Sequence, residues 1–108
     1  MSRAPESLDD LGRLSEPALL ILISLAEGPK HGYAMTQDIE SVSGQKLGPG
    51  TLYGAIARLE ARKWIEPLPA EDRRRPYKLT GAGQRVLRAR LEGLRAMARV
   101  GRARLAEG

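Results

Sequence analysis

The chain has 108 residues, of which 42% are hydrophobic, and this is enough for one domain with one modest core. It has no Cys, which excludes disulfides, thiolate metal ligands and cysteine nucleophiles. Its single His cannot build a zinc site without several carboxylate partners, so we expect no metal and no cofactor. The formal net charge of +5 favours an anionic partner, most commonly nucleic acid, although a solvated basic surface would carry the same charge.

The longest apolar run, residues 18–23, is too short to cross a bilayer. It also lacks the preceding basic segment and the following small-residue cleavage site of a signal peptide. We therefore expect a cytoplasmic protein that makes no membrane contact.

The first 14 residues are mostly polar and are interpreted as an N-terminal extension. A first helix is expected from Ser15, a good N-cap, to Glu27, because Gly28 and Pro29 end it. Its apolar residues cover nearly its whole circumference, which predicts burial on most sides.

Two further helices are expected before residue 64. The second runs from about residues 31–33 to 42, and its apolar stripe consists of Met35, Ile39 and Val42. After a turn, the third opens at Pro49, a favoured first position, and ends near residue 62 or 63. Its core-facing residues are Leu52, Ile56 and Leu59.

A change of pattern follows the third helix. Residues 64–68 and 77–79 alternate between apolar and polar, which predicts two strands joined as a hairpin. The charged connection, residues 69–76, makes the tip of this hairpin basic.

The last helix is expected from Gln84 to about Leu105, after a cap at Thr80, because this segment is rich in Ala, Arg and Leu. Its apolar positions alternate spacings of four and three, as in a helix that packs against another helix. No other segment of the chain could cover the whole seam, so we expect a homodimer. The seam consists of Leu87, Leu91, Leu94, Ala98, Gly101 and Leu105.

The order of these elements predicts a mainly α fold with a small β-hairpin. We assign residues 1–14 to the extension, 15–80 to a winged helix-turn-helix DNA-binding domain and 81–108 to a C-terminal dimerisation helix.

The third helix and the hairpin tip carry the candidate DNA contacts. Small residues on the outward face of the third helix would let it enter a major groove, where longer side chains reach bases or phosphates. Adjacent arginines at the tip repel one another unless an anion such as the DNA backbone neutralises them. A half-exposed helix and a solvated charge run would have the same appearance, and Glu71 and Asp72 partly neutralise the tip. With the second helix and the turn included, the candidates are Tyr33, Lys46, Thr51, Tyr53, Arg58, Arg73, Arg74, Arg75 and Lys78.

Two further residues have alternative interpretations. His31 could be a pH-sensitive contact, but we favour a hydrogen bond to a nearby carbonyl. Trp64, the only Trp, is expected to fill the core, with stacking in an effector pocket as the alternative. No arrangement of residues predicts catalysis, because the acidic residues have no clear Ser or His partner.

Four segments together resemble the PadR family of transcriptional regulators in order and spacing. They cover about residues 15 to 85 and are LAEGPKHGY at 25–33, GPGTLY at 48–53, RLE at 58–60 and RPYKLTGAG at 75–83. The resemblance implies a homodimeric winged-helix repressor with Tyr33, Thr51 and Tyr53 at the DNA surface and the hairpin tip in the minor groove. It also implies a dimer formed by the C-terminal helix and a response to small aromatic effectors.

The chain departs from this family pattern at two places. Gly54 stands where the family commonly has Pro, which would make the third helix less stiff. Lys63 and Trp64 replace a commoner Gly-Leu pair, which would reshape the start of the first strand or a pocket near it. The alternative function is a winged helix that binds a partner protein instead of DNA.

Overall fold

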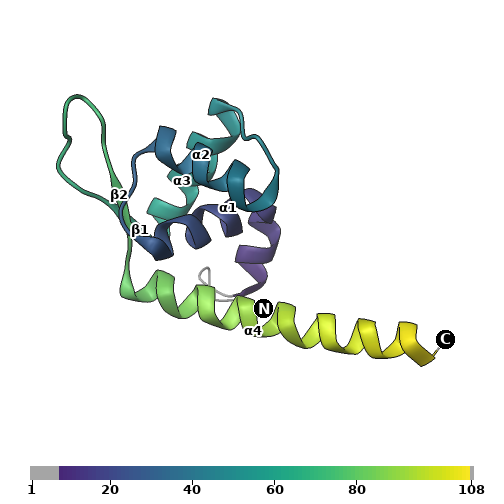
Figure 1. Ribbon diagram of the computed structural model, residues 1–108. Coiled ribbons are helices and arrows are strands. Elements are labelled where there is room, and N and C mark those ends of the chain that lie inside the picture. The colour runs from purple at the N-terminus through teal and green to yellow at the C-terminus, as the bar shows by residue number, and fades with distance from the viewer. Residues whose placement is uncertain (1–7, 108) are drawn as a thin grey trace.

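The computed structural model describes residues 8–107, with side chains from residue 16 onward, and shows a helical head from which one long helix projects (Figure 1). The predicted mainly α fold with one small hairpin is confirmed. In chain order the elements are α1 (Leu8–Glu27), α2 (Gly32–Ser43), α3 (Pro49–Ala61), β1 (Ile65–Pro67), β2 (Tyr77–Leu79) and α4 (Gly81–Glu107).

Helix α1 begins at Leu8, so the prediction that it starts at Ser15 is wrong. Ser15 and Pro17 have the composition of a helix start, but Pro17 lies inside the helix. A capping interaction contributes only about 1 kcal/mol, and a single proline removes one intrahelical hydrogen bond without necessarily ending the helix.

The core forms around α1. Its residues Ile21, Leu22 and Leu25 are almost fully buried. The other helices, the first strand and the bend before that strand contribute Met35, Ile39, Leu52, Ala55, Ile56, Leu59, Trp64, Ile65 and Leu87. The predicted stripe on α2 is buried at Met35 and Ile39, but Val42 lies in the last turn and is 63% exposed, which corrects that part of the prediction.

The two strands form an antiparallel hairpin in which Ile65 pairs with Leu79 and Pro67 with Tyr77. Residues 65–79 are called the wing below. At its tip Glu71 and Arg74 exchange backbone hydrogen bonds of 2.7 Å, and the two residues between them have positive φ angles of 49° and 68°. This is the backbone of a two-residue type I′ turn. It places Asp72 and Arg73 at the extreme tip.

A third segment pairs with the wing, and the sequence patterns did not predict it. Lys30, in the connection between α1 and α2, exchanges backbone hydrogen bonds with Tyr77 of 3.1 and 3.0 Å. This pairing joins the wing to the connection that leads into α2.

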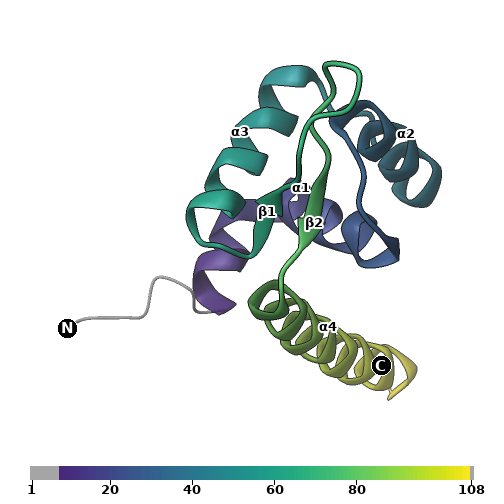
Figure 2. The ribbon, with the colours of Figure 1, turned by 90° about the vertical axis from the view of Figure 1, so that its left-hand side faces the viewer.

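Helix α4 begins at Gly81, three residues before the predicted Gln84, directly after the cap expected at Thr80. The Thr80 hydroxyl accepts a hydrogen bond from the Gly83 backbone N–H (3.0 Å) and donates one to the Lys63 carbonyl (2.7 Å). The cap therefore also fastens α4 to the end of α3. Figure 2 shows α4 running away below the head.

Candidate nucleic-acid interface

Helix α3 presents its predicted outward residues to solvent. Its buried residues, Leu52, Ile56 and Leu59 among them, hold one side of the helix against α1 and α2. The opposite side exposes Thr51, Tyr53 and Arg58. A narrow strip of small residues, including Gly54 and Ala57, lies among them and would allow close approach of a groove.

Two exposed tyrosines meet where α2 and α3 approach each other. Tyr33 is 63% exposed and Tyr53 is 52% exposed, and both line a hollow of about 250 Å³. The Gln37 side-chain amide donates to the Tyr33 hydroxyl at 3.0 Å. Two large aromatic side chains held at the surface are typical of a binding face.

Gly32 makes this arrangement possible. A Cβ at Gly32 would overlap the Tyr53 hydroxyl, so any side chain there would displace the Tyr53 ring. Glycine at position 32 is therefore favoured by the close contact with α3. Sequence patterns alone did not reveal this contact.

The basic residues of the wing are exposed, but they are not equivalent. Arg75 donates to the Leu68 carbonyl across the wing at 2.9 Å, and Lys78 lies 3.3 Å from the Glu66 carboxylate. Arg73 projects from the tip. Lys46, in the turn between α2 and α3, is also exposed.

The wing tip reaches the start of α2 through Arg74. An Nη atom of its guanidinium lies 3.4 Å from Nε2 of His31. Nδ1 of His31 accepts a hydrogen bond from the Ala34 N–H at 3.4 Å and so caps α2. The favoured prediction of a bond to a carbonyl is therefore wrong, because the ring faces the free N–H groups of the first helical turn.

Tyr77, on β2 of the wing, interacts electrostatically with Glu60 and Tyr53 of α3. Partial burial raises the pKa of its hydroxyl, the Glu60 carboxylate and Tyr53 add to the rise, and Arg75 opposes it. The Tyr77 hydroxyl therefore loses its proton at a higher pH than an ordinary tyrosine hydroxyl.

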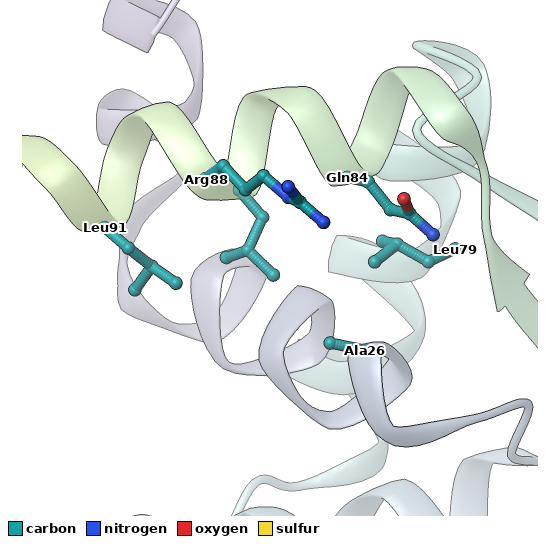
Figure 3. Close-up of a pocket in the computed structure, with 6 residues that line it drawn as sticks. Ala26, Leu79, Gln84, Arg88 and Leu91 are labelled. Carbon is teal, nitrogen blue, oxygen red and sulfur yellow. The ribbon is translucent and has the colours of Figure 1, made fainter.

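Trp64 is fully buried in the core, which favours the core interpretation over a stacking position in a pocket. The Arg62 guanidinium lies over its ring, 5.7 Å from the ring centroid. A separate cavity of about 290 Å³ lies between the end of α1, β2 and α4 (Figure 3), and Trp64 does not line it.

The predicted dimer seam on α4 divides into two parts. Leu87 is buried within the chain's own core, so it packs against the head. Beyond it Leu91 is 42% and Leu105 83% exposed, Ala98 is exposed, and Leu94 is half-buried. Met97 and Val100 are also exposed, and the seven-residue pattern did not include them.

Within residues 8–107, no group of three or more His, Cys, Asp or Glu residues could hold a metal ion. None of the helices in the same described range is long and apolar enough to span a membrane.

The known proteins that are similar to this chain agree with a nucleic-acid interface on α2, α3 and the wing. Residues 21–89 match the family described as the transcriptional regulator PadR-like family. An uncharacterized 37.1 kDa protein in transposon TN4556 of Streptomyces fradiae is 52% identical over 75 residues, which are 69% of this chain. Those residues cover 22% of that protein, so the chain spans about a fifth of its length.

Solved structures show the same fold. A transcriptional regulator from Clostridium thermocellum has a TM-score of 0.73 and 28% identity, covering 87% of this chain and 93% of that one. A PadR family transcription regulator from Clostridium difficile has a TM-score of 0.75 and 24% identity, covering 82% and 97%. At 24% identity, the similarity to the Clostridium difficile protein is evidence for the fold only.

Proposed function

Because the chain belongs to the PadR-like family of transcriptional regulators, we propose that it is a homodimeric repressor that binds a promoter operator and is released by a small aromatic effector. Membership of the family makes the chain a DNA-binding transcriptional regulator and not an enzyme. The dimer, the repression and the release by an effector are parts of this proposal that go beyond family membership. We place the protein in the cytoplasm, with the DNA that it binds.

The proposed DNA surface combines α3, the start of α2 and the wing. Thr51, Tyr53 and Arg58 face the major groove, where Arg can bond guanine and Thr can contact a thymine methyl group. The exposure of all three side chains supports this role. The backbone and the minor groove are held by Tyr33, Lys46, Arg73, Arg74, Arg75 and Lys78.

The dimer proposal rests on one observation, the apolar side chains that α4 leaves exposed. Leu91, Met97 and Leu105 are each at least 42% exposed. Exposed apolar side chains along a projecting helix are stabilised when a second helix covers them. A second copy of the chain would bring an identical seam and place two α3 helices in successive major grooves.

The cavity between the head and α4 is the proposed effector site. In Figure 3, Gln84, Arg88 and Leu91 on α4 lie across from Ala26 at the end of α1. Apolar walls with a few polar groups suit a small aromatic ligand. A ligand there would bear on α4 and so change the separation of the two DNA surfaces.

The test is a titration of DNA from the protein's own upstream promoter region against a scrambled duplex of equal length. We expect preference for the promoter duplex and a loss of affinity of roughly a thousandfold between about 50 and 200 mM salt, as for six phosphate contacts. Equal and salt-insensitive binding of both duplexes, or binding of neither, would favour the alternative of a winged helix that binds a protein.

A further inference from the structure

The pair formed by His31 and Arg74 brings two hydrogen-bond donors together. A neutral imidazole has one N–H and one acceptor nitrogen. We assign the ring proton to Nε2, because Nδ1 of His31 faces the Ala34 backbone N–H, a donor whose direction is fixed. Nε2 lies 3.4 Å from the Arg74 guanidinium, which has donors and no acceptor.

Two N–H groups that face each other cannot satisfy each other. An anion between or beside them accepts from both and also neutralises the guanidinium. The neighbouring arginines of the tip, Arg73 and Arg75, increase the positive potential at this point. The pair is therefore arranged for an oxyanion.

We propose that His31 and Arg74 together hold one phosphate of the DNA backbone, with His31 as a DNA contact in addition to its cap of α2. The inference rests on the proposed function, because the exposed surface of α2, α3 and the wing on which the pair lies is the proposed DNA surface. Because they share one phosphate, Arg74 of the wing and His31 before α2 contact the same DNA strand. This contact sets the position of the wing tip relative to α3.

His31→Asn separates the two roles of the ring. Asn is a preferred N-cap, so its side chain keeps the bond to the first turn of α2, but it is too short to reach the phosphate beside Arg74. We expect an unchanged thermal midpoint and roughly tenfold weaker binding to a duplex that the wild-type protein selects from a random-sequence pool. Unchanged affinity in a folded variant would overturn the proposal.

Arg74→Gln should lower the salt slope of binding by about one phosphate contact, whereas Arg99→Gln on the distal part of α4 should leave it unchanged. The double variant His31→Asn/Arg74→Gln should bind no more than about twofold more weakly than Arg74→Gln alone, because one phosphate serves both residues. Fully additive losses would contradict a shared phosphate.

Neutral methylphosphonate linkages, placed one at a time along the selected duplex, locate the contact. At one linkage the wild-type protein should lose roughly tenfold in affinity and the double variant His31→Asn/Arg74→Gln almost nothing. If every linkage weakens both proteins equally, the shared phosphate contact does not exist. If the wild-type protein selects no duplex at all, the proposed function fails first, so the two failures are distinguishable.

Discussion

Lys63 carries backbone strain at the end of α3. Its N–H bonds the Glu60 carbonyl (2.9 Å), and the Trp64 N–H bonds the Leu59 carbonyl (3.1 Å), which is the hydrogen-bond pattern of a Schellman motif. The motif requires a left-handed residue, and Lys63 has a φ of 63°. Glycine is preferred there because it has no Cβ penalty. The departure from the family pattern noted at this position therefore has an energetic cost.

Lys63→Gly should raise the free energy of unfolding by roughly 0.5–1 kcal/mol, because the left-handed conformation no longer strains a side chain. Urea titration followed by circular dichroism measures the change. Lys63→Ala keeps the Cβ and should give no such gain. Equal effects of the two variants would show that the Lys side chain, and not the backbone, decides stability at this position.

The raised pKa of Tyr77 predicts that the folded protein loses stability at alkaline pH. Its pKa is raised in the fold by burial and by Glu60, so the folded state keeps the proton after the unfolded state has lost it above about pH 10. Stability therefore falls as pH rises from about 10 through the folded pKa. Between pH 8 and 11 the wild-type protein should lose more unfolding free energy than Tyr77→Phe. Parallel losses would contradict this assignment.

At the scale of elements, Gly83, at the joint between the head and α4, makes the closest contact of any glycine between residues 16 and 107. A Cβ at Gly83 would overlap the Trp64 carbonyl oxygen, and the Thr80 N–H bonds that same carbonyl at 3.0 Å. This close approach sets where α4 leaves the head.

Gly83→Ala should destabilise the protein by about 2 kcal/mol, because backbone atoms must separate to admit the methyl group. Gly93→Ala, in the same helix with open space around the new Cβ, should stabilise it by about 0.5–1 kcal/mol. Thermal unfolding of both variants tests the joint. If the two substitutions have effects of the same sign, the head and α4 are not packed closely at Gly83.

Local patterns predicted most elements because their signals were strong. The Pro49 start of α3, the Thr80 cap and the alternating strands all lie where the sequence indicated. The start of α1 was mispredicted from the local signals at Ser15 and Pro17. Other features were missed because they depend on contacts between distant segments. The pairing of Lys30 with Tyr77, the burial of Leu87 against the head and the approach of Arg74 to His31 have no local signature.

Among the candidate DNA residues, too, some features followed from local patterns and others depended on contacts between distant segments. Helical periodicity predicted which side of α3 is exposed, since three spaced leucine and isoleucine positions mark the buried side. The partners of the wing arginines could not be predicted, because they depend on how the tip folds back toward α2. The contact of Arg74 with the His31 ring is an example.

At the scale of the whole molecule, the long helix α4 projects from the helical head. The radius of gyration is 15.2 Å, compared with about 13 Å for a compact chain of this length. Helix α4, with 27 residues, is about 40 Å long. The apolar side chains that α4 exposes would be buried if the α4 helix of a second chain packed against them. The paired α4 helices would then set the spacing of the two DNA surfaces.

Sedimentation equilibrium of the wild-type protein, Ala98→Glu and Ala103→Glu tests the dimer most directly. Ala98 lies on the proposed seam, and Ala103, which is also exposed, lies about 140° around the same helix. We predict that the wild-type protein and Ala103→Glu have twice the mass of one chain, whereas Ala98→Glu dissociates roughly thirtyfold more readily because a carboxylate enters the seam. A wild-type protein that remains a single chain at concentrations where it binds DNA, or identical behaviour of the two glutamate variants, would contradict the account.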